Sequence, residues 1–364
     1  MAKRRFMVVS GFLGSGKTTT MLSIADHLAK SKIRAAVISN DLGASELVDA
    51  MYTAENTALS GAIADGCICY QTELLVENIK RFSDVDGAGL VMSDIPGCGV
   101  GALEHVYFKL HRQYPEDFEL APFTVICDPL RLRAIMPEHA NLHLPQEINY
   151  LFRTQLLEAD VIVLNKTDTI SQTQQKKCLS FLNAAYPGIQ VFCISAKTGG
   201  GVPELCDYLM SHDARLREVD TGYGGQEFTA AEAQLSWYDR RVFISRETEF
   251  DGNGFMSDFA SSVAKKLKFG GKNVLHLKLF AAAGSDGDYA KASLIHVDYR
   301  LEFDRQLSKR CRSMRLVVNA RAACGSMLLG SVMDEAFSET VEEYGVKCQV
   351  FSTESFGMTD EDDR

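Results

Sequence analysis

The sequence predicts an α/β protein in which a mainly parallel sheet flanked by helices is followed by a smaller α+β domain. Through residues 1–210, short apolar runs alternate with helix-forming segments, an alternation typical of a parallel sheet. Beyond a glycine-rich stretch at residues 220–226, strands and helices follow in an order that suits a largely antiparallel sheet with helices on one face. A length of 364 residues also favours two domains over a single core.

The bulk composition is that of an ordinary globular protein. Hydrophobic residues make up 46% and charged residues 24% of the chain. The net charge of −10 argues against a general nucleic-acid binder, since phosphate backbones require clustered Lys and Arg. The apolar run behind the basic start at residues 1–5 is too short for a signal peptide or a membrane span. We therefore expect a cytosolic protein with reduced cysteines, no nucleic-acid partner and no membrane partner.

The first strong motif is G-F-L-G-S-G-K-T at residues 11–18. It follows an apolar strand at residues 6–10 and precedes an amphipathic helix at 19–30, which is the context that a phosphate loop requires. The glycines let the backbone curl so that N–H groups face phosphate oxygens, and the helix dipole adds positive potential. Lys17 can reach the β- and γ-phosphates, and the Thr18 hydroxyl can ligate Mg²⁺. The expected phosphate-binding residues are Gly11, Gly14, Ser15, Gly16, Lys17, Thr18 and Thr19.

A second apolar run, residues 34–39, reads as a buried strand that ends at Asn40 and Asp41. An acidic residue at the carboxyl end of such a strand lies near the phosphate crevice. Asp41 can therefore hold a Mg²⁺-bound water, or it can simply form a turn with Asn40.

Residues 89–97 read as a strand that ends in D-I-P-G. In phosphate-loop proteins the Asp of such a D-x-x-G contacts Mg²⁺, usually through water, while the Gly amide senses the γ-phosphate. Asp94 and Gly97 occupy these places, so Asp94 joins Thr18 as an expected Mg²⁺ ligand. Cys98 follows Gly97, which puts a thiol on the element that a change of nucleotide would move.

The second strong motif is N-K-T-D at residues 165–168, delivered by an apolar strand at 159–164. Asp168 can accept two hydrogen bonds from guanine N1 and N2, a pattern that adenine cannot donate. Asn165 can bond the base and tie neighbouring loops, and the stem of Lys166 can cover the base plane. A backbone N–H for guanine O6 is expected within Ser195, Ala196 and Lys197. In this order, the motifs specify GTP or GDP as the nucleotide.

Phosphoryl transfer in such a site is mostly positioning and charge neutralisation. The candidate catalytic residues are Lys17, Asp94 and Asp41. The sequence offers no convincing arginine finger or positioning glutamine. We therefore expect slow intrinsic GTP hydrolysis that a partner or dimerisation accelerates.

Residues 66–70, G-C-I-C-Y, place Cys67 and Cys69 one residue apart after a glycine. Two such thiols can converge on one soft metal ion, although on spacing alone two buried structural cysteines are the simpler interpretation. His139 and His143 have the spacing of a helical metal pair, but the prolines around them favour surface histidines.

The composition changes near residue 220, which marks a domain boundary. We place the GTP-binding domain at residues 1–219, a linker at 220–239, the α+β domain at 240–358 and a solvated acidic tail at 359–364. In the second domain the expected strands cover residues 241–245, 274–282, 290–299, 316–320 and 348–352, and the expected helices cover 256–267 and 333–344.

These motifs resemble those of the CobW-like GTPases, related to the nickel-insertion GTPases HypB and UreG. The matching pieces are GFLGSGKTT, NDLG, GCICY, SDIPGCG, EADVIVLNKTD and SAKTGGGV, within roughly the first 210 residues. The chain departs from the family pattern at Tyr70, where the third thiol of G-C-x-C-C is expected, and at Asp94, where Glu is typical. A histidine-rich metal stretch is absent from the sequence.

The resemblance implies a GTPase that delivers a metal or metallocofactor to a client enzyme, and it allows a GTP-dependent homodimer. It also implies that Cys67 and Cys69 bind Zn²⁺, Co²⁺ or Ni²⁺, with Cys98 or a partner's residue as a further ligand. The alternative is a GTPase chaperone of a corrinoid (cobalamin)-dependent enzyme, in which the cysteines are structural and Mg²⁺ is the only metal. A biosynthetic kinase is disfavoured by the N-K-T-D motif.

Overall fold

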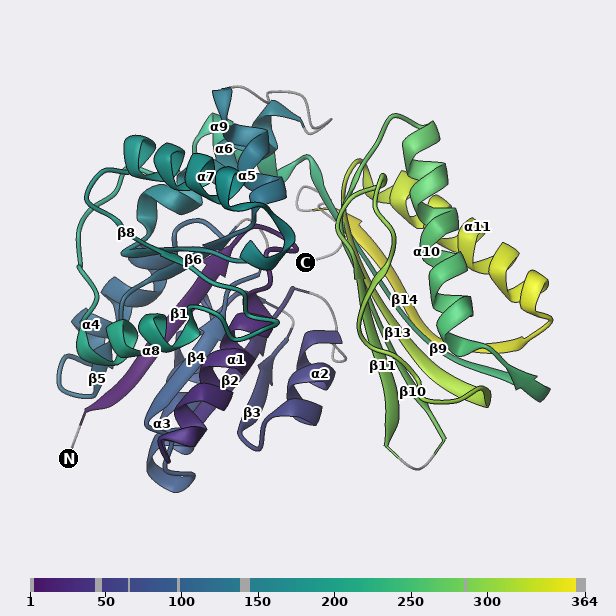
Figure 1. The fold of residues 1–364 in the computed structure, drawn as a ribbon, viewed down its shortest axis with the longest axis horizontal. Helices are drawn as coiled ribbons and strands as arrows, with labels where there is room; N and C mark the ends of the chain where they lie inside the picture. The colour runs from purple at the N-terminus through teal and green to yellow at the C-terminus, as the bar shows by residue number, and fades with distance from the viewer. Residues whose placement is uncertain are drawn as a thin grey trace. The chain divides into compact units, whose positions relative to one another are not determined.

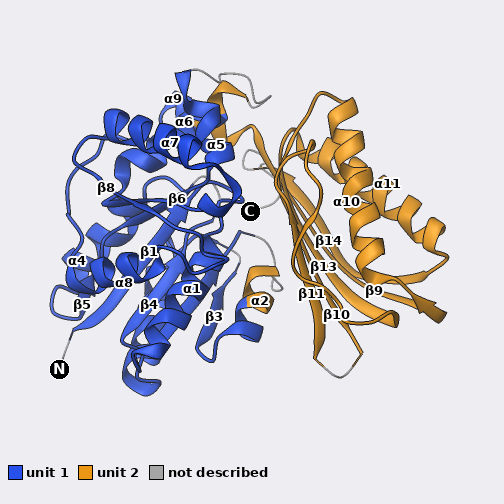
Figure 2. Ribbon diagram, viewed as in Figure 1, with its two compact units in different colours: residues 1–42, 53–142, 148–228 blue, residues 43–52, 143–147, 229–364 orange. Residues whose placement is uncertain are grey.

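The computed structural model describes residues 3–42, 48–64, 66–96, 99–137, 145–284 and 287–357 (Figure 1). The chain divides into two compact units, which Figure 2 shows in different colours. Unit 1 comprises residues 1–42, 53–142 and 148–228, and unit 2 comprises residues 43–52, 143–147 and 229–364. In the described part of the chain, no helix has the length and apolar character needed to cross a membrane.

Unit 1 is built on an eight-stranded sheet in which every described pairing is parallel. The strand order is β3-β2-β4-β1-β6-β7-β8, and β5 pairs with the first residues of β1, whereas β6 pairs with its last residues. The strands are β1 (Arg4–Gly11), β2 (Ala35–Asn40), β3 (Ser60–Ile63), β4 (Leu90–Asp94), β5 (Phe118–Leu120), β6 (Thr124–Cys127), β7 (Val161–Leu164) and β8 (Gln190–Cys193). The predicted parallel sheet is confirmed.

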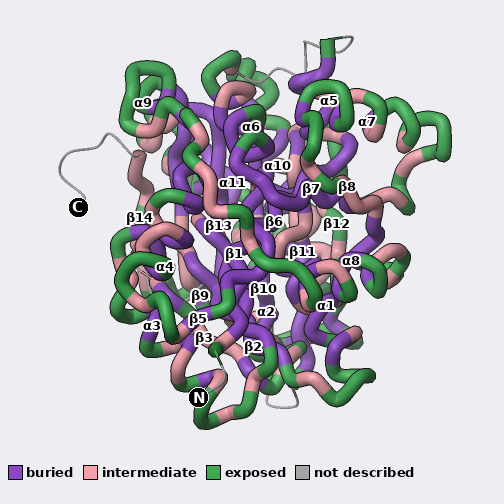
Figure 3. The backbone as a smooth tube through the Cα atoms, turned by 90° about the vertical axis from the view of Figure 1, so that its left-hand side faces the viewer, coloured by how far each residue is buried: buried purple, intermediate pink, exposed green. Residues whose placement is uncertain are grey.

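Helices cover both faces of this sheet. Met21, Ile24 and Leu28 of α1 share one core with Val9 of β1 and with α8. Residues of opposite parity on β1 are also fully buried, as expected of a parallel strand between two helical layers (Figure 3). The helices of unit 1 are α1 (Lys17–Lys30), α3 (Thr72–Lys80), α4 (Lys109–Gln113), α5 (Pro129–Ile135), α7 (Gln172–Ala185) and α8 (Val202–Ser211). Helices α2 (Val48–Asn56), α6 (Gln146–Glu158) and α9 (Gln226–Glu232) each have residues in both units. Shorter helical turns are η1 (Arg81–Val85), η2 (Leu103–Phe108) and η4 (Thr167–Thr169).

The parallel order brings the carboxyl ends of the strands to one edge of the sheet. The phosphate-loop motif follows β1, Asp94 ends β4, and the N-K-T-D motif follows β7. Ligands of such sheets bind outside the carboxyl ends of the strands, so the topology gathers all the predicted motifs at this edge.

Unit 2 contains a six-stranded antiparallel sheet of order β12-β11-β10-β13-β9-β14. Its strands are β9 (Leu235–Phe250), β10 (Val274–Ala283), β11 (Asp288–Leu294), β12 (Glu302–Arg305), β13 (Cys311–Ala323) and β14 (Lys347–Gly357). Helices α10 (Gly252–Phe269) and α11 (Ser326–Tyr344) share a core with one face of the sheet, so the predicted α+β architecture is confirmed. Strand β9 begins inside the stretch expected as a linker, because Trp237 and Tyr238 are buried.

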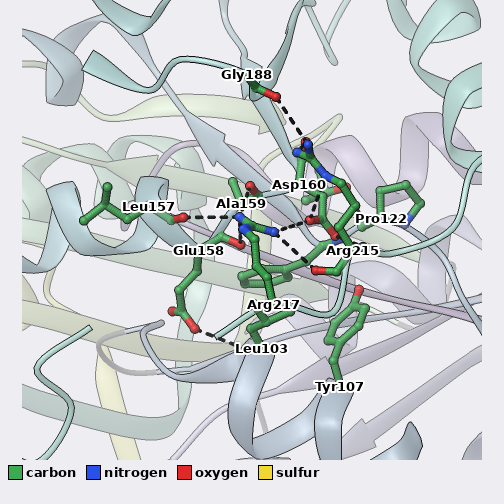
Figure 4. Close-up of polar contacts among 12 residues, drawn as sticks. Leu103, Tyr107, Pro122, Leu157, Glu158, Ala159, Asp160, Gly188, Arg215 and Arg217 are labelled. Atoms are coloured by element: carbon green, nitrogen blue, oxygen red, sulfur yellow. Dashed lines mark hydrogen bonds and ion pairs between the residues drawn. The ribbon is translucent and has the colours of Figure 1, made fainter. Parts of the chain in front are cut away.

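The residues after α8, from 212 to 225, are held to unit 1, and we call them the strap. Its main anchor is Asp160, whose side chain is 3% exposed. The Asp160 carboxylate accepts the Phe123 amide at 3.0 Å, the Arg215 amide at 3.1 Å and the Arg217 guanidinium at 2.5 Å (Figure 4). Arg217 also donates to the carbonyls of Leu157, Glu158 and Ala159, at the end of α6.

Substitution of Arg217 tests this anchor. In Arg217→Ala the buried Asp160 carboxylate loses its closest cation, so we expect the free energy of unfolding to fall by about 3 kcal/mol. Urea denaturation of the variant and the unchanged protein measures this difference. The matched control is Lys177→Ala, an exposed position on α7, for which a change within about 0.5 kcal/mol is expected. Equal changes in the free energy of unfolding in the two variants would show that Arg217 does not anchor the strap.

Candidate functional site

The phosphate loop depends on two glycines for its path. Gly11 has φ +139°, and a Cβ there would lie 2.0 Å from the Ile126 carbonyl oxygen of β6. Gly16 has φ +94°, and a Cβ there would lie 2.5 Å from Asn165 Nδ2. Both are left-handed conformations that favour glycine, and both are packed against neighbouring loops. The sequence therefore folds this turn only with glycine at these positions.

The residues of the loop fit a nucleotide's phosphates. The Ser15 hydroxyl is buried and has no hydrogen-bond partner within the described residues. Lys17 Nζ donates to the Gly11 carbonyl at 3.1 Å, so its charge lies over the loop. Helix α1 begins at Lys17 and has no acidic residue in its first turn, which leaves the positive helix end uncompensated by its own side chains. Thr18 and the half-buried Thr19 follow on the same turn.

The N-K-T-D loop is tied to the phosphate loop by side chains. Asn165 is 2% exposed; its Nδ2 donates to the Ser15 carbonyl at 2.8 Å and its Oδ1 accepts the Ala196 amide at 3.0 Å. Lys166 Nζ donates to the Gly14 carbonyl at 2.6 Å. Asp168 lies in η4 and is exposed, as is Lys197, whereas Ser195 is buried. The structure thus brings the phosphate, N-K-T-D and S-A-K segments together.

Asn40 could not be picked out from the sequence, yet it joins two predicted elements. It is 4% exposed at the end of β2, and its backbone amide donates to Asp94 Oδ1 at 2.7 Å. Its side-chain Nδ2 donates to the carbonyls of Ile63 and Gly66, at 2.8 and 2.7 Å, and its Oδ1 accepts the Ile68 amide at 3.0 Å. A polar residue at the end of a fully buried strand is the one signal in the sequence that hints at such a role.

Cys67 and Cys69 converge in the stretch of residues 66–70, which we call the cysteine loop. Their Sγ atoms lie 2.7 Å apart, and the Cys69 amide lies 3.3 Å from Cys67 Sγ. Lys109 Nζ donates to the Cys69 carbonyl at 2.6 Å. The pKa of Cys67 is lowered, chiefly by the hydrogen bond with the Cys69 thiol and further by the Cys69 amide and the Lys109 charge, against desolvation and the charge of Asp94.

The thiol pair is chemically suited to a soft divalent metal but supplies only part of a ligand set. Two Zn–S bonds of about 2.3 Å at a tetrahedral angle would place the sulfurs about 3.8 Å apart, so the thiols would separate on binding. Among the described residues, no group of three or more His, Cys, Asp or Glu side chains could hold a metal ion. Gly97 and Cys98 lie outside the described residues, as do His139, His143 and the tail at 359–364.

Tyr70 occupies the position of the third thiol in the resembling family. Its side chain is 71% exposed, and its hydroxyl lies 2.7 Å from the hydroxyl of Tyr223. Asp41 makes the turn contact that was one of its two expected roles, since its carboxylate accepts the Leu42 amide at 2.8 Å. Its role near Mg²⁺ stays a prediction.

Glu158, at the end of α6, is the second residue that spacing did not reveal. It is 1% exposed and accepts the amides of Gly101 at 2.7 Å and Leu103 at 3.3 Å. Burial raises the pKa of this carboxyl to about 7, although the two amides and the Arg217 charge act to lower it. Glu158 therefore fixes residues 99–105, which follow the D-x-x-G motif and which we call the exit segment (Figure 4).

The first half of the chain matches the sequence profile of a known protein family. The sequence profile of "CobW/HypB/UreG, nucleotide-binding domain" matches residues 5–192. The zinc chaperone YeiR of Escherichia coli (strain K12) is 29% identical over 177 residues, which cover 47% of this chain and 49% of YeiR. The GTPase Obg of Lachnoclostridium phytofermentans is 31% identical over 130 residues, which cover 35% of this chain and 30% of Obg. The chain thus spans a third to a half of the length of these curated relatives.

Two solved structures are also similar. The Zn(II)-bound YjiA GTPase from E. coli matches with 11% identity and a TM-score of 0.33, covering 94% of this chain and 99% of YjiA. HypB from Helicobacter pylori in complex with nickel matches with 14% identity and a TM-score of 0.39, covering 56% of this chain and 85% of HypB.

The pKa of Glu158 predicts a pH dependence of stability. Between about pH 4.5 and 7 the folded state holds a proton that the unfolded state has lost, so stability falls as pH rises through this window. In Glu158→Gln we expect this part of the slope, about 3 kcal/mol in total, to disappear. Urea denaturation between pH 4 and 8 measures it, with the exposed Glu204→Gln as control. An unchanged slope in Glu158→Gln would refute the assignment.

Proposed function

We propose that this chain, which belongs to the CobW/HypB/UreG family of GTP-binding proteins, slowly hydrolyses GTP and carries a transition metal for delivery to a client enzyme. The observation that carries the proposal is the bonding of Asn40, which joins Asp94 to the cysteine loop. The Asp94 end of the nucleotide site and the thiol pair are therefore both bonded by one buried residue, the first through its backbone amide and the second through its side chain.

The nucleotide half of the proposal assigns each motif a task. Lys17 and the amides of the phosphate loop hold the phosphates, and Asp168 selects guanine. Thr18 and Asp94 would hold Mg²⁺, with Asp41 on one of its waters; when bound, Mg²⁺ neutralises charge on the phosphates. The Gly97 amide would sense the γ-phosphate, and a backbone amide among residues 195–197 would meet guanine O6. With no arginine finger assigned, turnover is slow until a partner or a second copy assists.

The metal half treats the ion as cargo. Cys67 and Cys69 are soft ligands, which favours Zn²⁺, Co²⁺ or Ni²⁺ over Mg²⁺. Two thiolates leave ligand positions open, and an open position is what an acceptor needs in order to take the metal by ligand exchange. Cys98 or a residue of the client would complete the set. The description of one similar protein, YeiR, as a zinc chaperone agrees with this class of cargo.

Coupling between the halves follows from the contacts of Asn40. The backbone amide of Asn40 donates to the Asp94 carboxylate, so any movement of Asp94 on loss of the γ-phosphate changes the position of Asn40. Its side chain bonds the backbone at Gly66 and Ile68, on both sides of Cys67. Hydrolysis would thus alter the geometry of the thiols and release the cargo.

Nucleotide selectivity tests the first half. In Asp168→Asn the two hydrogen bonds to guanine are disrupted, so GTP affinity should fall at least about tenfold while xanthosine triphosphate binds better. Calorimetric titration with both nucleotides measures the shift, and the exposed Asp207→Asn is the matched control. Tighter binding of ATP than GTP by the unchanged protein would instead support a kinase.

Metal binding tests the second half. Titration of Co²⁺ in the presence of a GTP analogue or GDP should give thiolate absorption that depends on the nucleotide and vanishes in Cys67→Ser/Cys69→Ser. Cys348→Ser, at an exposed cysteine of β14, should leave the signal unchanged. Absence of any cobalt signal in the unchanged protein would contradict the metal carrier and favour the corrinoid-chaperone alternative.

A further inference from the structure

Tyr223 of the strap contacts two segments that lie far from it in the sequence. Its hydroxyl lies 2.7 Å from that of Tyr70, which directly follows Cys69 in the cysteine loop. Its ring centroid lies 4.6 Å from that of His105 in the exit segment, at an interplanar angle of 51°. All these residues belong to unit 1.

The contact with the exit segment is close to the backbone. A Cβ on Gly101 would lie 2.9 Å from Tyr223 Cδ2, so this glycine lets the ring rest against the chain. The Gly101 amide also donates to Glu158 at 2.7 Å. The exit segment therefore contacts both the Glu158 carboxylate and the Tyr223 ring at the same glycine.

The strap presents Tyr223 in a fixed conformation. Tyr150 of α6 donates its hydroxyl to the Thr221 carbonyl, and the Gly222 amide donates to Asp220 Oδ1 at 3.1 Å. Gly225 closes the turn by donating to the Gly222 carbonyl at 2.9 Å. The strap continues by chain connection into unit 2, which resumes at residue 229.

The contact with the cysteine loop is a single hydroxyl pair at an exposed side chain. Tyr70 is 71% exposed, and Lys109 Nζ lies 5.9 Å from its ring centroid while donating to the Cys69 carbonyl. Burial does not explain why an aromatic residue stands where the family pattern has a thiol. The hydroxyl pair gives Tyr70 a specific contact with Tyr223.

We propose that Tyr223 is a positioning residue for the thiol pair, which links the exit segment to the cysteine loop by a route separate from Asn40. It contacts the exit segment with its ring and the cysteine loop with its hydroxyl, so a nucleotide-driven movement of residues 99–105 reaches Cys67 through Tyr70. The inference rests on the proposed function, because it concerns the same thiols and the same dependence on the bound nucleotide.

The test is the rate of alkylation of Cys67 by iodoacetamide in metal-free protein, resolved by mass spectrometry, with GDP or a non-hydrolysable GTP analogue bound. The rates in the unchanged protein should differ about fivefold, the value of one ordinary hydrogen bond. Tyr223→Phe keeps the ring and removes the hydroxyl, so we expect faster alkylation at nearly equal rates in both states. Tyr70→Phe should give the same result, and the double variant should add nothing, because both remove one bond.

Tyr114→Phe is the matched control, since Tyr114 lines the same shallow hollow beside Tyr70. It should retain the difference between nucleotides. Retention of the difference in both Tyr223→Phe and Tyr70→Phe, or its absence in the unchanged protein, would overturn the inference. Because no metal is present, this outcome is independent of the cobalt titration, which alone decides whether the thiols carry metal.

Discussion

The side chain of Asn40 is the constraint on which the rest of the site depends. A buried amide has to satisfy its donors and its acceptor, and Asn40 does so with the carbonyls of Ile63 and Gly66 and the amide of Ile68. Its backbone amide simultaneously holds the Asp94 carboxylate. These contacts exist because β2 pairs with β4, which sets the ends of the two strands side by side. The cysteine loop is therefore shaped by the same residue that positions the Mg²⁺ ligand candidate.

Much of this protein could be predicted from its sequence, because the nucleotide site is built from short contiguous motifs. The phosphate loop and the N-K-T-D loop are short motifs at strand ends, and their order along the chain implies a parallel sheet. The roles of Asn40 and Glu158 could not be predicted, because their partners Gly66 and Gly101 lie 26 and 57 residues away. The sequence predicts a strand from residue 241, whereas β9 begins at Leu235, because Trp237 is buried by tertiary packing within a stretch whose composition resembles a linker.

Tyr70 stands where the family pattern has a third thiol, and its contacts involve the strap. A third cysteine in the loop would offer a fuller ligand set, whereas Tyr70 leaves a pair and bonds Tyr223 instead. That bond requires a strap that is fixed, and the strap is fixed because Asp160 and Arg217 anchor it to the end of α6. The same end of α6 carries Glu158, which holds the exit segment. The exit segment and the strap are thus both held at the end of α6 by buried polar groups.

In the proposed function, Asn40 transmits the nucleotide state to the thiols. The most direct measurement is the ratio of Zn²⁺ dissociation constants with a GTP analogue and with GDP, in the unchanged protein and in Asn40→Ala. We expect a ratio of about tenfold in the unchanged protein and a ratio close to one in Asn40→Ala, while Asn78→Ala on the exposed side of α3 keeps the tenfold ratio. A tenfold ratio that survives in Asn40→Ala would show that the Asn40 side chain does not transmit the nucleotide state.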